Sequence, residues 1–389
     1  MLEPNHAQAE SFPDPNPPAL PSRKPALPAL TGLRTLLAIN IMFFHFTPPH
    51  PAFLTPLLDN AYVFVGFFFL ISGFVLAYNY ADRPTLSKRS FWVARLSRVY
   101  PVYLLVLALS IPFVVIAERP AHTYFDWILG IVLTPFALQS WSPILATYWN
   151  TVAWTVPAEI ALYFLFPYLL KLLKSVNHRI ATPGRLIALI GVIWIVGLIP
   201  HTTYLLLNPD HLTAPATRYT YAYWLRALKY SPPAYICTFT AGVLLARLHG
   251  ILTLKPAHRT LLAAIALGGL ALFFATAVDQ IPYVLIHGCL LLPLFAMLLL
   301  GLAGPGVITS AFSWKPLVKI GETTFSLYLI HFNAFLLIHY YHLPERLHIA
   351  RFDPWISYIV IIAVAFGILR FYEGPARKFV LKTFTPNPA

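Results

Sequence analysis

The chain has 389 residues, of which 58% are hydrophobic and only 11% are charged, and its mean hydropathy is +0.68. A soluble domain carries roughly a quarter charged residues because its surface faces water, so this composition excludes an ordinary soluble protein and predicts a polytopic membrane protein. The net charge of +13 would suit nucleic-acid binding in a soluble chain. In a membrane protein it indicates cytoplasmic loops rich in Lys and Arg, and we expect no nucleic-acid partner.

The first 28 residues form a proline-rich segment that lacks an apolar core. Such a segment is neither a signal peptide nor able to bury enough apolar surface to fold. We therefore predict three parts for the chain. These are a disordered cytoplasmic N-terminal tail over 1–28, a transmembrane domain over 29–376 and a cytoplasmic C-terminal tail over 377–389.

Apolar runs bounded by charged residues, proline or glycine predict the membrane-spanning helices. A helix needs about 20 residues to cross the hydrocarbon core, which leaves room here for about ten. We predict an all-α, polytopic helix bundle with spans near 29–47, 61–80, 100–117, 155–173, 184–200, 233–249, 260–279, 282–303, 319–341 and 354–373. Cys237 and Cys289 lie inside two of these runs, so they predict neither a disulfide framework nor a metal site.

The apolar run 124–140 is ambiguous because it is short and is interrupted by Pro135. Cytoplasmic loops are enriched in Lys and Arg. If the run does not cross, 20 of the 27 Lys and Arg residues lie on the side of both termini and six on the opposite side; if it crosses, this bias collapses. We therefore predict cytoplasmic termini and an outer loop over 118–153. The run is a candidate re-entrant segment, which protein groups would have to satisfy.

Arg34 and His45 lie inside the first predicted span, where an ionisable side chain costs several kcal/mol unless it faces a polar interior. Eleven helical steps leave the two side chains within about 20° of each other, on one face and roughly 16 Å apart along the axis. In one interpretation Arg34 reaches the cytoplasmic interface and His45 caps the outer end. In the other, a cation and a base line one transmembrane channel.

Glu159 stands at the outer start of a later span, with Tyr163 four residues further on. Pro157 is typical of a first helical turn, and a carboxylate at that place interacts favourably with the helix N-terminus. The alternative is a carboxylate that orients or charges a catalytic imidazole.

Tyr328 and His331 are three residues apart and share a face of the ninth predicted span. A lone buried histidine is more often a satisfied core group than a functional one. Together with His45 and Glu159, however, His331 becomes a candidate member of one pocket.

Arg95 and Arg98 are spaced three residues apart just before the third predicted span, so they share a helical face. Basic residues beside a span often serve only to fix its orientation. Two guanidinium groups on one face also suit phosphate recognition. Coenzyme A, with its pyrophosphate and 3′-phosphate, is a cytoplasmic ligand of that kind.

Taken in order, these residues resemble the motifs of the family-three membrane acyltransferases. That family includes O-acetylases of bacterial lipopolysaccharide, peptidoglycan and exopolysaccharide, and macrolide acylases. The likeness covers roughly residues 28–380 and lies in six segments: Gly32 to Arg34 with His45, Phe67 to Phe74, Arg95 to Tyr103, Trp154 to Glu159 with Thr155 in place of serine, Phe325 to His331, and Glu373 to Pro375.

The resemblance implies an acyl-CoA-dependent O-acyltransferase with no bound cofactor. Transfer from a thioester to a hydroxyl needs a base, an oxyanion donor and a firmly held acyl donor. A histidine suits the base because its pKa lies near working pH. The predicted site residues are His45 and Glu159 for catalysis, Arg34, Arg95 and Arg98 for acyl-CoA binding, and His331, Tyr328, Ser72 and Trp154 as candidate pocket members.

We expect acetyl-CoA as the co-substrate, a carbohydrate or glycolipid as the acceptor, and the bacterial inner membrane as the location. A covalent acyl-histidine variant stays open. The alternative from another class is a transporter or flippase of a lipid-linked glycan, which would also use many spans and intramembrane charges. A structural membrane subunit would fit the hydropathy but gives the buried charges no purpose.

Overall fold

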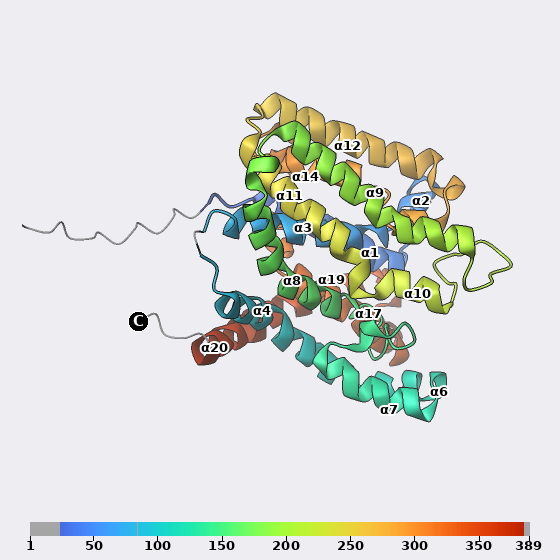
Figure 1. Cartoon of the computed structure of the whole chain (residues 1–389). Coiled ribbons are helices and arrows are strands. Elements are labelled where there is room, and N and C mark those ends of the chain that lie inside the picture. The colour runs from blue at the N-terminus through green and yellow to red at the C-terminus, as the bar shows by residue number, and fades with distance from the viewer. Residues whose placement is uncertain (1–23, 84, 385–389) are drawn as a thin grey trace, which may run out of the picture.

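The computed structural model describes residues 24–83 and 85–384, and within these ranges the chain is helical without any β-strand (Figure 1). The predicted all-α polytopic bundle is therefore confirmed. Most of the N-terminal tail predicted over 1–28 lies outside the described residues, and the first helix, α1 (Pro28–His45), begins at the end of that segment. Pro28 has the fixed φ that suits a first helical position.

In the described ranges, eight helical stretches are long and apolar enough to cross a membrane. They contain α3 (Val63–Tyr80), α4 (Lys88–Leu109), α8 (Thr155–Ser175), α9 (Pro183–Leu207), α11 (Ile236–Ile251), α12 (Pro256–Thr276), the pair α13 (Tyr283–His287) and α14 (Leu292–Leu302), and α19 (Trp355–Ile368) continuing into α20 (Gly374–Phe384). The other two predicted spans correspond to α1, which carries several polar residues, and to α17 (Thr324–Tyr340), which has 17 residues.

Shorter helices connect these stretches: α2 (Thr55–Asp59), α5 (Ile111–Phe113), α6 (Arg119–Ala121), α7 (Tyr124–Leu133), α10 (Tyr223–Tyr230), α15 (Val307–Phe312), α16 (Lys315–Gly321) and α18 (Leu343–Arg346). Several boundaries differ from the sequence-based ones, most clearly those of the third span and of the C-terminal tail. The third span begins at Lys88 and ends at Leu109 instead of covering 100–117, because the Ser87 side chain caps the helix by accepting from the Ser90 N–H at 3.4 Å. The C-terminal tail predicted from 377 is helical as far as Phe384.

Helices α4 and α8 run antiparallel. At the end of α8, Lys174 Nζ donates to the Arg83 carbonyl oxygen, 2.6 Å away and just ahead of α4. Trp92, near the start of α4, donates from Nε1 to the Tyr163 carbonyl oxygen of α8 at 3.1 Å. The chain between the two helices therefore starts and ends at one end of the bundle, where Figure 1 shows α6 and α7, opposite α20.

The ambiguous run 124–140 forms α7 and a 3-10 turn over Thr134–Phe136. Ten helical residues rise about 15 Å, roughly half the hydrocarbon thickness, so α7 is too short to cross by itself. The turn reaches the middle of α4, where the Tyr100 and Tyr103 hydroxyls donate to the carbonyl oxygens of Pro135 and Thr134, each at 2.5 Å. Side chains of α4 thus donate hydrogen bonds to backbone carbonyl groups that follow α7, as a re-entrant segment requires.

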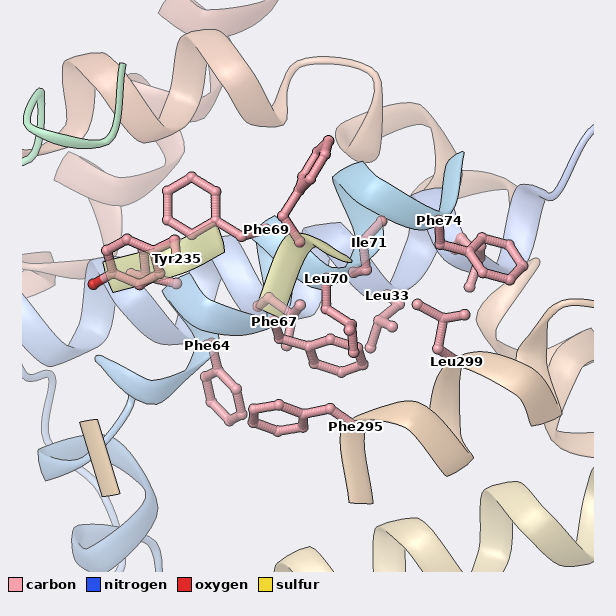
Figure 2. Close-up of a cluster of buried hydrophobic side chains, with 14 of the residues drawn as sticks. Leu33, Phe64, Phe67, Phe69, Leu70, Ile71, Phe74, Tyr235, Phe295 and Leu299 are labelled. Atoms are coloured by element: carbon pink, nitrogen blue, oxygen red, sulfur yellow. The ribbon is translucent and has the colours of Figure 1, made fainter. Parts of the chain in front are cut away.

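The centre of the bundle is the packing of α3 against α11. A Cβ atom added at Gly73 would lie 2.1 Å from the Phe239 carbonyl oxygen, and one at Gly242 would lie 2.1 Å from that of Leu70. Small residues on both helices therefore allow the two backbones to touch, which is how helices associate without a hydrophobic drive between them. On the other side of α3, the Phe67 and Phe295 rings stack at 4.4 Å (Figure 2).

Candidate active site

Two adjoining chambers lie inside the bundle, one lined by arginines and one by histidines. The arginine chamber has a volume of about 120 Å³ and contains Arg34, Arg95, Arg98 and Glu159 in its wall. The histidine chamber has a volume of about 410 Å³ and contains His45 and His287. The larger volume is typical of small-molecule sites. Val65 and Tyr328 line both chambers, so they mark the boundary between them.

Helix α1 connects the chambers. Arg34, in its first half, lines the arginine chamber, and His45, its last residue, lines the histidine chamber. The 3.6-residue period puts both side chains on one face, as the sequence predicted. Thr35 on the same helix donates to the Leu317 carbonyl oxygen of α16 at 2.6 Å and fixes the rotation of α1.

The arginine chamber carries an excess of positive charge. The ion pairs of the described residues include none of its three arginines. Arg34 lies over the Phe68 ring at 6.0 Å, and Arg95 donates from Nη2 to the Tyr80 hydroxyl at 3.3 Å. Arginine guanidinium groups that carry no carboxylate partner can bind phosphate oxygens in pairs.

Glu159 lies in the wall of this same chamber, on α8. Its carboxylate accepts a hydrogen bond from the Tyr163 hydroxyl one turn further on. In the part of the chain that the structure describes, no hydrogen bond or ion pair joins Glu159 to a histidine. The structure therefore places this carboxylate among the arginines, on the other side of the Tyr328 boundary from the His45 chamber.

Behind His45 lies a second imidazole. The ring of His331, which is 1% exposed, has its centroid 5.4 Å from that of His45. His331 Nδ1 is 2.7 Å from the Tyr328 carbonyl oxygen. Because a carbonyl only accepts, Nδ1 carries a proton, and in the neutral ring Nε2 is then the acceptor. Within the described residues Nε2 is buried without a partner.

The structure distributes the predicted site residues over the two chambers. Those lining the arginine chamber are Arg34, Ser72, Arg95, Arg98 and Glu159. Those lining the histidine chamber are His45 and Trp154. Tyr328 lines both, and His331 contacts His45 and Tyr328 through its ring. The arrangement thus offers a cation-rich chamber next to one lined by imidazole side chains.

Sequence reasoning missed most of the wall of the histidine chamber. It includes Arg218 and Lys229 from the segment between α9 and α11, Tyr62 ahead of α3, and Tyr283 and His287 from α13. One signal could have found the two cations. They are among only six Lys and Arg residues in the loops predicted to be outside, where topology gives cations no role.

Comparisons with known proteins agree with the family resemblance of the sequence. The family described as "Acyltransferase domain" matches residues 27–369. The chain is 27% identical over 345 residues to the acyltransferase MdmB of Streptomyces mycarofaciens, covering 83% of this chain and 82% of MdmB. It is 24% identical over 393 residues to the O-acetyltransferase OatA of Staphylococcus aureus, covering 93% of this chain but only 59% of OatA. No solved structure matches.

Proposed function

The chain belongs to the family of membrane acyltransferases, and from this premise we propose that it moves an acyl group, acetyl in the first instance, from acyl-CoA to a hydroxyl of a carbohydrate or glycolipid. The observation that carries the proposal is the placement of Arg34 and His45 on one face of α1, each lining a different chamber. One chamber can hold the phosphates of the donor while the other holds the acceptor.

The donor would bind through its phosphates in the arginine chamber. Arg34, Arg95 and Arg98 supply guanidinium groups that form no ion pair with a carboxylate in the described part of the chain. Charge-assisted bonds to phosphate are about twice as strong as neutral ones. Glu159 in the same wall offsets part of this positive charge when no donor is bound. The extended pantetheine arm is long enough to cover the roughly 16 Å between Arg34 and His45, which brings the thioester past Tyr328.

The chemistry would take place at the boundary of the two chambers. His45 accepts the proton of the acceptor hydroxyl as that oxygen attacks the thioester carbonyl. The carbon–oxygen bond forms, and the negative charge moves to the former carbonyl oxygen, to which the Tyr328 hydroxyl would donate. Collapse of this intermediate breaks the carbon–sulfur bond, and the leaving thiolate takes the proton from His45. The products are the ester and free CoA.

We place the protein in the bacterial inner membrane with both termini in the cytoplasm. The Lys and Arg bias of the loops supports this orientation. It puts Arg34 near the cytoplasm, where acyl-CoA is made, and His45 near the outer side, where surface carbohydrates are assembled. The acyl group would then be transferred through the bundle without release of CoA on the outer side.

The test is release of free CoA from acetyl-CoA by the purified protein in detergent, with mass spectrometry of the acceptor. An acyltransferase releases CoA only as the acceptor gains an acetyl group, whereas a transporter or flippase moves a glycan and leaves the thioester intact. The acceptor itself would be identified by mass spectrometry of surface glycans from cells with and without the gene. Intact acetyl-CoA in the presence of extracts that contain those glycans would refute the proposal.

A further inference from the structure

Two cations in the wall of the histidine chamber have no task in acyl transfer as described above. Arg218 lies in the segment between α9 and α10, and Lys229 lies in α10. Their partners differ. The Arg218 guanidinium is paired with Asp59, 3.3 Å from its Oδ1 and 3.0 Å from its carbonyl oxygen. Lys229 is in none of the ion pairs of the described residues.

Lys229 is nevertheless deeply buried, with 5% of its surface exposed. Its Nζ donates one hydrogen bond, to the Arg218 carbonyl oxygen at 3.2 Å, so two of its three N–H groups have no acceptor among the described residues. The rings of Tyr230 and Tyr283 lie 5.2 and 5.3 Å from Nζ and stabilise the positive charge only modestly. An ammonium group in such surroundings costs several kcal/mol unless an anion pairs with it.

The rest of the chamber wall does not supply that anion. Its lining contains aromatic and aliphatic side chains, two histidines and a threonine, but no Asp or Glu among the described residues. Burial, and to a lesser degree the neighbouring Arg226 guanidinium, lower the pKa of Lys229 from its ordinary value to about 8. The side chain therefore still carries its proton at neutral pH and is available to an anion that enters the chamber.

We propose that the histidine chamber takes an acceptor that carries an anionic group, a carboxylate or a phosphate, which pairs with Lys229 while the hydroxyl to be acylated faces His45. This inference rests on the proposed function. An ammonium is a point charge that accepts either anion, so the structure specifies the charge of the acceptor and leaves the two sources to experiment. The aromatic side chains around it, Tyr62 and Trp154 among them, offer flat surfaces to the apolar faces of a sugar ring.

The phosphates of the donor do not compete for this place. They bind on the other side of the Tyr328 boundary, in the arginine chamber, from which Lys229 is absent. A loss of the Lys229 charge should therefore weaken acceptor binding and leave acetyl-CoA binding unchanged. This difference separates an anion site for the acceptor from a second donor site.

The experiment measures sugar binding to the purified full chain in detergent by calorimetry, without acyl-CoA. The probes are glucose, glucuronate and glucose 1-phosphate, which share a ring and differ in charge. We expect at least one of the two anions to bind about tenfold or more tightly than glucose, because one charged contact is worth at least about 1.4 kcal/mol. A preference for glucuronate identifies a carboxylate, and a preference for glucose 1-phosphate identifies a phosphate. Equal binding of all three, or no binding of either anion, would overturn the inference.

Lys229→Gln should bring the affinity of the preferred anion down to that of glucose, and Lys229→Arg should preserve the preference. The matched control is Lys255→Gln, since Lys255 is exposed and lines neither chamber. An unchanged preference in Lys229→Gln would contradict the inference, and unchanged acetyl-CoA binding shows that the variant is folded.

Binding is measured without turnover, so the two proposals fail separately. If the anions bind as expected but no acceptor elicits CoA release, the anion site stands and the proposed acyl transfer fails. If CoA is released equally fast with neutral and with anionic acceptors, the proposed acyl transfer is supported and the inference of an anionic acceptor is refuted.

Discussion

The two chambers are built from different parts of the fold. In the arginine chamber every charged side chain stands on a long helix, α1, α4 or α8. Of the histidines and cations that line the histidine chamber, only His45 does so, because His287 lies on the short helix α13, Lys229 on the short helix α10 and Arg218 in a connecting segment. Long helices hold a site rigidly, whereas connecting segments tolerate change. Under the proposed function, the donor site would therefore be the more rigid of the two and the acceptor site the more variable.

The largest effect that would test this difference between the chambers is expected from replacing His45, the proposed base of the histidine chamber. His45→Gln keeps a hydrogen-bonding side chain but cannot accept a proton at neutral pH. Transfer should therefore slow by at least about a hundredfold, while the affinity for acetyl-CoA should stay the same. Acetyl-CoA binding and acetyl transfer would be measured on one preparation. His258→Gln is the control, since His258 is exposed on α12.

Near-normal transfer by His45→Gln would remove His45 from the mechanism. His331, whose Nε2 is buried without a partner among the described residues, would then be the base to test.

The second prediction concerns variants that remove positive charge from the arginine chamber. Arg98→Ala should lower the affinity for acetyl-CoA by about tenfold or more, because a phosphate loses a charge-assisted contact. Arg98→Lys should recover only part of it, since lysine lacks the planar fork. We expect the same loss for Arg95→Ala and Arg34→Ala. Arg89→Ala is the control on the same helix, with an exposed side chain outside both chambers. Full affinity in the three chamber variants would leave these arginines with a role in topology alone.

A smaller effect on the affinity for an anionic sugar is expected when the pH is raised through the pKa of Lys229. Its pKa of about 8 means that the cation is lost as pH rises through that value, so the affinity for an anionic sugar should fall several-fold while that for glucose stays level. Lys229→Arg should remain flat, because arginine stays charged. The charged and titratable groups around Lys229 are Arg218, Arg226, His287, Tyr230 and Tyr283. An equal fall for Lys229→Arg would assign the effect to one of these groups.

The orientation of the chambers can be tested without changing either of them. Reporter domains fused after residues 90, 176, 256 and 310 should lie in the cytoplasm, and those after 145 and 210 should lie outside. Between 90 and 145 the chain crosses once if α7 only re-enters the membrane. Fusions after 90 and 145 that report the same side would show that the segment 124–140 crosses. All helices after this segment would then have the opposite orientation in the membrane. The arginine chamber, which they help to form, could no longer be placed on the cytoplasmic side.

The sequence by itself determined the features of this protein that depend on local periodicity. Long apolar runs are helical in lipid because no other local structure satisfies the backbone there, so the spans could be predicted without any tertiary information. The shared face of Arg34 and His45 follows from the 3.6-residue repeat of one helix. The family likeness also rests on short segments in which each motif is local. Boundaries were less certain, as α4 shows, because a cap at Ser87 moved its start.

Tertiary structure alone decided which residues share a chamber. Asn150 donates to the carbonyl oxygen of Leu329 across 179 residues of sequence, and Arg218 reaches Asp59 across 159. No pattern within a helix encodes such contacts, since they depend on how the helices pack. For the same reason the sequence could suggest Glu159 as a partner of an imidazole but could not place it among the arginines. The wall around Lys229 exists only once α10 and α13 lie beside α1 and α3.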